Sequence, residues 1–278
     1  MNLTGVGRRY GMRRPWVLRG VSLELPRGAL VRVEGGNGGG KSTLLRLVAG
    51  IDSPTEGRIS GRPRRTAYVP ERFPAALPLT AVSYLTHLGR VHGLPRADAA
   101  RRAAGWLERF GAAAYARTPL AELSKGTSQK VAVAQALLAE PGLLVLDEAW
   151  TGLDAPARAE LDLAVAERTA AGATVLFVDH DPRRLAGAPD AHYRVEAGAL
   201  APVPGTPRHG EGPPVDGPRV RIHAAGPPGL APPPGLAAAP APDGGVLLTV
   251  AAARSDTVLR DLLTARPPWH IRAVEELP

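Results

Sequence analysis

The chain has 278 residues, enough for one large domain with a small appendage, and its 44% of hydrophobic residues can fill a packed core. It contains no cysteine, which excludes a disulfide scaffold, thiol catalysis and a thiolate metal site and is compatible with a reducing cytosol. Lys and Arg (34) exceed Asp and Glu (26), but the arginine pairs are scattered as codon bias would scatter them, so we expect no nucleic-acid partner.

The sequence also lacks a segment suited to enter a membrane. No stretch approaches the roughly 20 apolar residues that a helix needs to span a bilayer. Residues 1–10 lack the apolar core of a signal peptide. We therefore expect a protein that is soluble by itself.

The first fifty residues predict strands, then a loop, then a helix. Short apolar runs within residues 3–25 are typical of antiparallel strands that end at a turn, Pro-Arg-Gly. Residues 29–34 predict a strand that runs into a glycine-rich loop, and the leucines after Ser42 have helical spacing up to Gly50.

The middle of the chain predicts a helical insertion and then alternating helices and strands. Residues 74–123 carry apolar side chains at helical spacing on both sides of a Gly-Pro break. Helices are predicted at residues 128–139 and 155–171, and fully apolar strands at residues 143–146 and 174–178. Strands that are apolar on both faces and alternate with helices predict a parallel sheet covered by helices.

Beyond Gly198 the composition shifts toward Pro and Gly. We predict a linker at residues 201–218 and a small accessory α/β domain, in part disordered, at residues 219–278. Within that domain, strands are predicted at residues 220–222, 246–250 and 271–274, and a capped helix at residues 255–265.

The glycine-rich loop carries the strongest chemical signal. Residues 35–42 match the pattern G-x-x-x-x-G-K-[ST] between a predicted strand and a predicted helix, a context that disfavours a merely flexible glycine turn. Its backbone N–H groups would surround the phosphates of ATP, Lys41 would bridge the β- and γ-phosphates, and Ser42 would ligate Mg²⁺. Lysine occurs at only three positions, and a compact ammonium reaches between phosphates better than a guanidinium. The residues predicted to bind nucleotide here are Gly35, Gly36, Asn37, Gly38, Gly39, Gly40, Lys41, Ser42 and Thr43.

Two carboxylates, Asp147 and Glu148, end the apolar strand at residues 143–146. An Asp-Glu pair in this position is usually a solvated turn or a helix cap, but the upstream phosphate loop reverses that interpretation. Both side chains should lie at the carboxyl edge of the sheet, beside the loop. Asp147 is suited to hold Mg²⁺ through water, whereas Glu148 can accept a proton from the attacking water.

The order of these motifs over residues 1–200 resembles the nucleotide-binding subunit of the ATP-binding cassette (ABC) superfamily. Residues 123–129, Leu-Ser-Lys-Gly-Thr-Ser-Gln, resemble the family signature, for which a simple helix cap is the alternative. The resemblance implies an α/β P-loop NTPase of the ABC ATPase type, with a parallel-sheet core, an antiparallel β subdomain and a helical insertion. It also implies two copies paired head to tail, with Ser124 and Gly126, accompanied by Gln129, contacting the γ-phosphate on the partner's P-loop.

Four more positions take roles from the resemblance alone. Tyr10 resembles the aromatic residue that stacks on adenine, with an ordinary strand-edge tyrosine as the alternative. His180 resembles the switch histidine that contacts the γ-phosphate, with a buried core histidine as the alternative. Asp154 lies in a loop that resembles the one crossing the dimer interface, and we expect it to cap the following helix as well. Glu71 stands where the family commonly has Gln; it can still approach Mg²⁺ or the lytic water, but its charge puts the coupling to transport in doubt.

Two further departures touch the motifs without removing a ligand. Lys125 stands where the signature usually has Gly, and Gly36 stands where many relatives have Pro.

The resemblance implies an ATP-binding and ATP-hydrolysing transporter subunit. It would act as a dimer on a separate membrane permease, at the inner face of the cell membrane. The Ser-Lys-Gly form of the signature and the appended C-terminal segment favour the exporter branch. Import remains an alternative, as do a soluble ABC-type ATPase acting on the ribosome or nucleic acid and a regulatory cassette with little turnover. The cargo cannot be identified, because a permease would select it.

Overall fold

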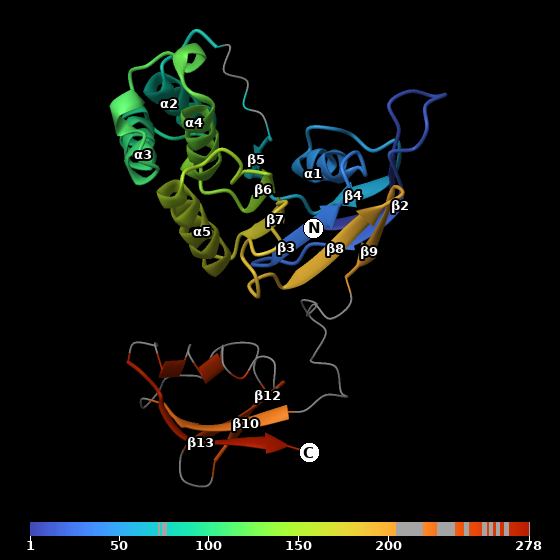
Figure 1. Ribbon diagram of the computed structural model, residues 1–278, viewed down its shortest axis with the longest axis vertical. Helices are drawn as coiled ribbons and strands as arrows, with labels where there is room; N and C mark the ends of the chain where they lie inside the picture. Colours follow the sequence, from blue (N-terminus) through green and yellow to red (C-terminus); the bar gives the residue numbers. More distant parts are fainter. Residues whose placement is uncertain are drawn as a thin grey trace. The chain divides into compact units, whose positions relative to one another are not determined.

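The computed structural model describes residues 1–71, 73, 77–203, 219–226, 237–241, 245–251, 255, 258–259, 262–263 and 267–277. The chain forms two compact units, Met1–His209 and Gly210–Pro278 (Figure 1). The division falls within the predicted linker, most of which lies outside the described residues, as do the first residues of the predicted helical insertion.

The centre of the first unit is a six-stranded sheet in the order β5-β6-β7-β3-β8-β9. Five strands are parallel, and β9 runs antiparallel to β8 at one edge. The predicted apolar strands β6 and β7 lie inside this sheet and are buried throughout, which confirms the parallel core. The strands are β3 (Leu30–Gly35), β5 (Thr66–Val69), β6 (Leu143–Asp147), β7 (Thr174–Val178), β8 (Ala191–Glu196) and β9 (Ala199–Pro202).

A second sheet has three antiparallel strands in the order β2-β1-β4. Strands β1 and β2 precede the glycine loop in the sequence, and β4 follows α1. It confirms the antiparallel strands predicted near the start of the chain. Its strands are β1 (Asn2–Arg8), β2 (Leu18–Glu24) and β4 (Glu56–Ser60).

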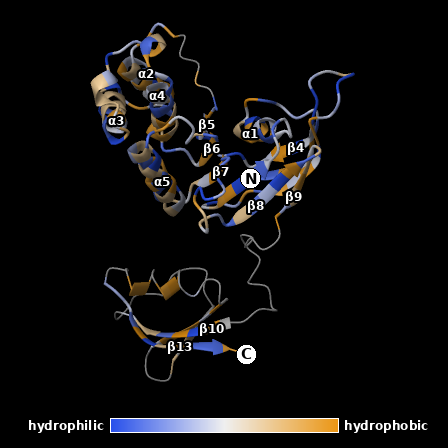
Figure 2. Ribbon diagram, in the orientation of Figure 1, coloured by the Kyte–Doolittle hydropathy of each residue, from blue (hydrophilic) through white to orange (hydrophobic). Residues whose placement is uncertain are grey.

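Helices cover the parallel sheet on both faces. Helix α1 (Lys41–Ala49) buries Leu44, Leu45, Leu47 and Val48 against one face, in a core that also holds Val31 and Val33 of β3. On the other face, α4 (Lys125–Leu138) and α5 (Ala155–Ala170) bury apolar residues with Leu30 and Phe177. Figure 2 shows these hydrophobic stretches concentrated in the strands and on the helices beside them.

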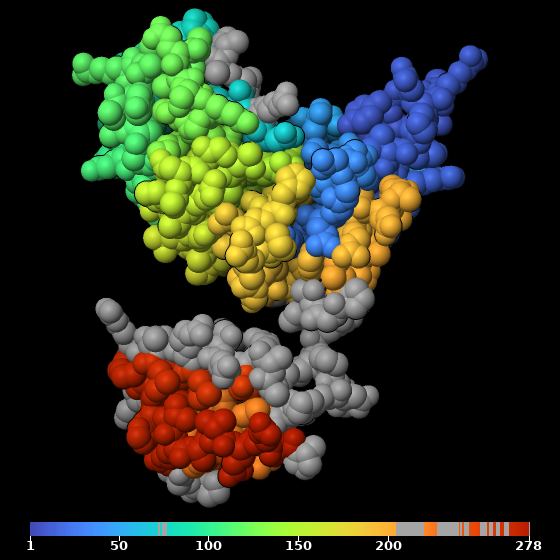
Figure 3. All heavy atoms as spheres, in the orientation of Figure 1, coloured from blue at the N-terminus to red at the C-terminus, as the bar shows by residue number. Residues whose placement is uncertain are grey.

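The helical insertion consists of α2 (Ala81–Val91) and α3 (Arg96–Arg109), which pack against each other and against α4. Two short 3₁₀ helices, Ala113–Tyr115 and Leu120–Glu122, lead into α4. We expected α4 to begin at Ser128, but it begins at Lys125, because the Ser124 hydroxyl accepts the Thr127 N–H and caps the helix three residues earlier. Within the first unit, the insertion and the β1–β2 region project on either side of a notch (Figure 3).

The second unit is a four-stranded antiparallel sheet in the order β11-β12-β10-β13. Residues 255, 258, 259, 262 and 263 are helical, and Val258 and Leu262 pack into its core. The three predicted strands are present, whereas β11 was not predicted, because its Ala-rich sequence lies in a Pro-rich stretch. The strands are β10 (Arg219–Ala225), β11 (Ala237–Pro240), β12 (Val246–Ala251) and β13 (His270–Leu277).

Among the helices in the described ranges, none is both long and apolar enough to cross a bilayer.

Candidate functional site

The glycine-rich loop connects β3 to α1 through backbone that only glycine adopts freely. Gly35 (φ 148°) and Gly40 (φ 105°) both have positive φ. A Cβ atom on Gly40 would come within 2.9 Å of the Leu18 side chain, and one on Gly35 would overlap the Val195 carbonyl. Gly40 caps α1 without any side-chain acceptor, so no side chain competes for the first N–H groups of the helix. This terminus is therefore suited to bind an anion.

Lys41 lies inside this loop and is only 7% exposed. Its Nζ donates hydrogen bonds to Gly35 O (2.8 Å) and Gly36 O (3.0 Å). In the described part of the chain no carboxylate forms an ion pair with it. A buried ammonium held only by carbonyl oxygens beside a helix N-terminus fits the phosphates of a nucleotide.

Asp147 connects the loop to the end of β6. Its Oδ1 accepts from Ser42 Oγ (3.3 Å) and its Oδ2 accepts from the Tyr68 hydroxyl (2.9 Å). Burial raises the pKa of Asp147, these two hydrogen bonds act in the opposite direction, and the charge of Glu71 adds to the rise. Burial also raises the pKa of Tyr68, and the Asp147 charge adds to that rise. The predicted residues Ser42, Asp147 and Glu71 therefore belong to one electrostatic cluster.

The cluster has the oxygen chemistry of a Mg²⁺ site. Mg²⁺ usually takes one or two protein oxygens and completes its shell with water and substrate phosphates. Across the described residues, no group of three or more His, Cys, Asp or Glu could hold a metal by itself. The donor set of one serine hydroxyl and one carboxylate beside a phosphate loop fits Mg²⁺ that enters with a nucleotide.

Glu148 and His180 meet at the same sheet edge because β6 and β7 are adjacent parallel strands. Glu148 Oε1 lies 2.7 Å from His180 Nε2. Glu148 has a left-handed backbone (φ 53°), and its N–H donates to Val178 O (3.0 Å). The Glu148 side chain is 16% exposed and the His180 side chain 56% exposed, so His180 is not a buried core histidine.

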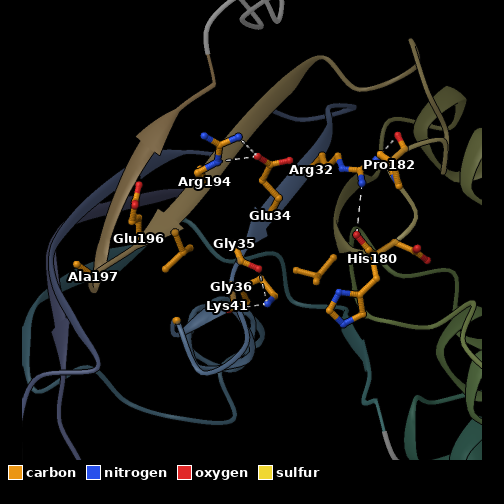
Figure 4. Close-up of a pocket in the computed structure, with 14 residues that line it drawn as sticks. Arg32, Glu34, Gly35, Gly36, Lys41, His180, Pro182, Arg194, Glu196 and Ala197 are labelled. Atoms are coloured by element: carbon orange, nitrogen blue, oxygen red, sulfur yellow. Dashed lines mark hydrogen bonds and ion pairs between the residues drawn. The ribbon is translucent and has the colours of Figure 1, made fainter.

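A cavity of about 580 Å³ joins the loop to His180. Gly36, Gly39 and Lys41 line one part of it, and Asp179 and His180 line another. Figure 4 shows Lys41 turned to the Gly35 and Gly36 carbonyls and the His180 ring facing the same opening. The phosphate loop and His180, the partner of Glu148, therefore line one space.

Tyr10 lies on the other side of α1. Its hydroxyl donates to Asp52 Oδ2 (3.0 Å) and lies 3.4 Å from Thr43 Oγ1, while the Arg8 guanidinium stands 4.6 Å from its ring centre. Asp52, beyond the end of α1, and Thr43, in its first turn, hold the hydroxyl, and 47% of the residue is exposed, so Tyr10 has a fixed and accessible ring. This geometry is compatible with the predicted stacking on a base, which stays a prediction.

The signature segment lies elsewhere in the fold. Ser124 caps α4, and a Cβ atom on Gly126 would come within 2.9 Å of Gly152 O. Gln129 is buried, and its amide donates to Ala149 O (3.2 Å). In Figure 1, α4 lies with α2 and α3 on one side of the first unit and α1 on the other. The chain therefore does not bring these residues to its own phosphate loop.

Asp154 caps α5 as expected. Its carboxylate accepts from Ala157 N (3.0 Å) and from Lys130 Nζ (2.7 Å). Its predicted role at a dimer interface stays a prediction.

Two residues of the site were missed from the sequence. Tyr68 was not predicted, although a hydroxyl on β5, the strand beside β6, can reach the end of β6. Arg32 gave a clearer signal, because it is a charged residue between Val31 and Val33 in an otherwise apolar strand.

The glycine loop between a parallel strand and a helix, with Lys41 and Ser42 at the start of that helix and Asp147 at the end of β6 in the same sheet, defines a P-loop nucleoside-triphosphate hydrolase. The family described as ABC transporter matches residues 18–151. The zinc import ATP-binding protein ZnuC of Cereibacter sphaeroides is 42% identical over 181 residues, which cover 64% of this chain and 72% of the relative. The aliphatic sulfonates import ATP-binding protein SsuB of Mycobacterium avium is 37% identical over 227 residues, which cover 70% of this chain and 88% of the relative.

Solved structures agree with this assignment. A structure described as the ATP binding subunit of an ABC transporter superposes with a TM-score of 0.67 at 29% identity, covering 73% of this chain and 88% of that chain. A dimeric post-hydrolysis cassette bound to ADP and Pi has a TM-score of 0.63 at 24% identity, covers 73% of this chain and 99% of that chain, and supports the fold alone. The chain belongs to the ATP-binding, ATP-hydrolysing subunits of ABC transporters.

The expected exporter branch finds no support in these comparisons. The two relatives described above are both named as import proteins. Export therefore stands only on the Ser-Lys-Gly form of the signature and the appended C-terminal unit.

Proposed function

We propose that this chain binds MgATP and hydrolyses it to power import through a separate membrane permease. The observation that carries the hydrolytic part is the Glu148 carboxylate 2.7 Å from His180, a residue that lines the same cavity as the phosphate loop. Import is supported by the names of the similar proteins. Export, the alternative, is favoured only by the form of the signature and by the C-terminal unit.

Phosphate binding falls to the loop and α1. The N–H groups of the loop and of the first helical turn would donate to phosphate oxygens, and Lys41 would exchange its two carbonyl acceptors for β- and γ-phosphate oxygens. Ser42 and Asp147 would hold Mg²⁺, with Glu71 close to the same cluster. When bound, Mg²⁺ neutralises charge on the phosphate oxygens.

Glu148 is the proposed general base. Its carboxylate would accept a proton from the attacking water as the water oxygen bonds to the γ-phosphorus and the bond to the β-phosphate oxygen breaks. His180 holds Glu148 Oε1 in place, and its ring, which already faces the cavity, would donate to the γ-phosphate.

A second copy of the chain would complete the site. Ser124 and Gly126 lie at the N-terminus of α4, on the side of the unit away from α1 (Figure 1), so they can reach a phosphate loop only in another copy. Gln129 supports that segment from within, and Asp154 would lie at the same interface. The permease would dock on the helical insertion, with the ATPase at the inner face of the cell membrane.

The hydrolytic part is tested by Glu148→Gln, with Glu108→Gln on the exposed face of α3 as the matched control. Glu148→Gln should lower phosphate release by roughly 10²–10⁴-fold and leave ATP binding intact, because only the proton acceptor is lost. Glu108→Gln should hydrolyse ATP as the parent does. Parental hydrolysis by Glu148→Gln would show that another group is the base.

The transport part is tested by solubilising membranes that contain the tagged chain and identifying the proteins that copurify. Recovery of a multi-span membrane protein supports a permease partner, and stimulation of the complex by an extracytoplasmic solute-binding protein supports import. Recovery with ribosomes or DNA would overturn the transport assignment. If cargo accumulates on the side of the vesicle membrane opposite the ATPase, the protein powers export and not import.

A further inference from the structure

Arg32 is a buried cation in the middle of β3 and is 6% exposed. Its neighbours Val31 and Val33 face α1, so the Arg32 side chain lies on the opposite face of the sheet. Removing a guanidinium from water costs several kcal/mol unless hydrogen bonds replace the water. The partners of Arg32 therefore indicate why this strand carries a charge.

Those partners are four backbone carbonyls of one short segment that contains His180. The Nη1 atom donates to Pro182 O (3.2 Å) and Arg184 O (3.1 Å). The Nη2 atom donates to Asp179 O (3.3 Å) and Asp181 O (3.0 Å). Figure 4 shows this guanidinium directed at the backbone on both sides of His180. One side chain thus fixes the carbonyls at residues 179, 181, 182 and 184.

Within the segment, the Asp181 N–H donates to Asp179 Oδ1 (2.7 Å) and the Arg183 N–H donates to Asp181 Oδ1 (2.9 Å), which shapes the turns locally. The segment is a series of turns and not a helix, and the His180 side chain is 56% exposed, so packing does not fix its ring. One further tether is Arg184, which lies 3.4 Å from Asp162 and 5.5 Å from the Trp150 ring centre. Those turn bonds act within the segment, whereas Arg32 ties four of its carbonyls to β3, so the position of His180 relative to Glu148 depends on the backbone that Arg32 holds.

We propose that Arg32 is a positioning residue for ATP hydrolysis, which fixes residues 179–184 so that His180 meets Glu148. The proposal rests on the function proposed above, in which Glu148 accepts the proton from water. Lysine is a poor substitute, because a planar guanidinium presents paired donors to four acceptors whereas an ammonium is a single point. The loop and α1 do not depend on these bonds, so the effect should fall on kcat and not on ATP affinity.

The test uses two variants of the full chain. Arg32→Met keeps most of the length of the side chain but removes its charge, and Arg32→Lys keeps the charge but removes the paired N–H donors of the guanidinium. Arg62→Met is the matched control, since Arg62 also donates to carbonyls, Leu47 O and Val48 O, but at the end of α1. Arg32→Met should lower kcat by about 10–100-fold with KM and the ATP Kd within about twofold of the parent, as expected for a misplaced catalytic group. Arg32→Lys should restore part of the loss, and Arg62→Met should lower the melting temperature without lowering kcat.

A double variant separates positioning from general stability. If Arg32 acts through His180, Arg32→Met should add no further loss of kcat in a His180→Ala background. Full kcat in folded Arg32→Met or Arg32→Lys would overturn the proposal, as would an undiminished loss in the His180→Ala background. If Arg32→Met does not fold, Arg32→Lys decides alone, with intermediate kcat supporting the proposal. Parental activity in both His180→Ala and Glu148→Gln would instead refute the proposed hydrolytic site.

Discussion

Tyr68 and Asp147 are joined by a 2.9 Å hydrogen bond from the phenol to Oδ2, across the adjacent strands β5 and β6. This bond occupies one carboxylate oxygen and directs the other, Oδ1, to Ser42. The phenol thereby sets the orientation of the carboxylate that is proposed to hold Mg²⁺.

Tyr68→Phe should raise the Mg²⁺ concentration needed for half-maximal ATP hydrolysis by about 10–100-fold, the usual cost of losing a group that orients a metal ligand. At saturating Mg²⁺ the rate should approach that of the parent. The control is Tyr84→Phe, which removes a comparable hydrogen bond to Gln135 (2.7 Å) in the helical insertion. An unchanged Mg²⁺ dependence in Tyr68→Phe would exclude the orienting role.

Lys41→Arg should weaken ATP binding by about 10–100-fold, the equivalent of one hydrogen bond to a charged group. The ammonium fits between Gly35 O and Gly36 O at 7% exposure, and a wider planar group cannot replace it there without moving the loop. Isothermal titration calorimetry with ATP measures the change. Lys130→Arg, at the ion pair with Asp154, should bind ATP as the parent does; equal affinity in both variants would contradict the prediction.

Asp154 should contribute stability in a pH-dependent way. Hydrogen bonds from Lys130 and from the Ala157 N–H lower its pKa below the ordinary value of 3.8. A carboxylate with a lowered pKa stabilises the fold above pH 3.8, and the contribution disappears as the pH falls through the lower, folded-state pKa.

Two substitutions at this position separate the helix cap from the charge. At pH 7, Asp154→Ala should lower the free energy of unfolding by about 0.5–2 kcal/mol, because the cap of α5 is lost. Asp154→Asn keeps a capping oxygen and should cost less, about 0.2–1 kcal/mol. Urea titrations over a pH series should show the Asn penalty constant above pH 3.8 and shrinking below it; a penalty that grows with acid would refute the assignment.

Ile222→Ala should destabilise the C-terminal unit alone. Ile222 is fully buried with Leu248 and Leu262 in a core whose described residues all belong to the C-terminal unit. Truncating it should cost about 2–5 kcal/mol, visible in scanning calorimetry as one shifted transition beside an unshifted one. ATP hydrolysis by the folded first unit should be unchanged. A single transition that shifts as a whole would show that the two units unfold together.

Local patterns in the sequence predicted the parts of the fold that local physics determines. The apolar runs of β6 and β7 and the spacing of leucines in α1 specify a buried strand or a helix without reference to distant residues. The sheet order does not follow from such patterns, because β3 lies between β7 and β8 through contacts about 140 and 160 residues away along the chain.

In the candidate site, too, the sequence predicted what local patterns determine and not the contacts between distant residues. Asp147 and Glu148 could be assigned to the phosphate loop, because the carboxyl ends of parallel strands share an edge. The contact of Glu148 with His180 needs the positive φ of Glu148 and the turns after β7, which no periodicity encodes. These residues do not indicate the direction of transport, and the exporter expectation finds no support among the relatives.

The two carbonyl bonds of Lys41 have a thermodynamic consequence. The Lys41 ammonium already donates hydrogen bonds to Gly35 O and Gly36 O before a nucleotide arrives. Nucleotide binding therefore exchanges one set of hydrogen bonds for another. In the proposed cycle, the number of polar contacts at the ammonium would stay nearly constant with and without nucleotide. Discrimination between ATP and ADP would then depend on groups that contact the terminal phosphate, the role proposed for His180.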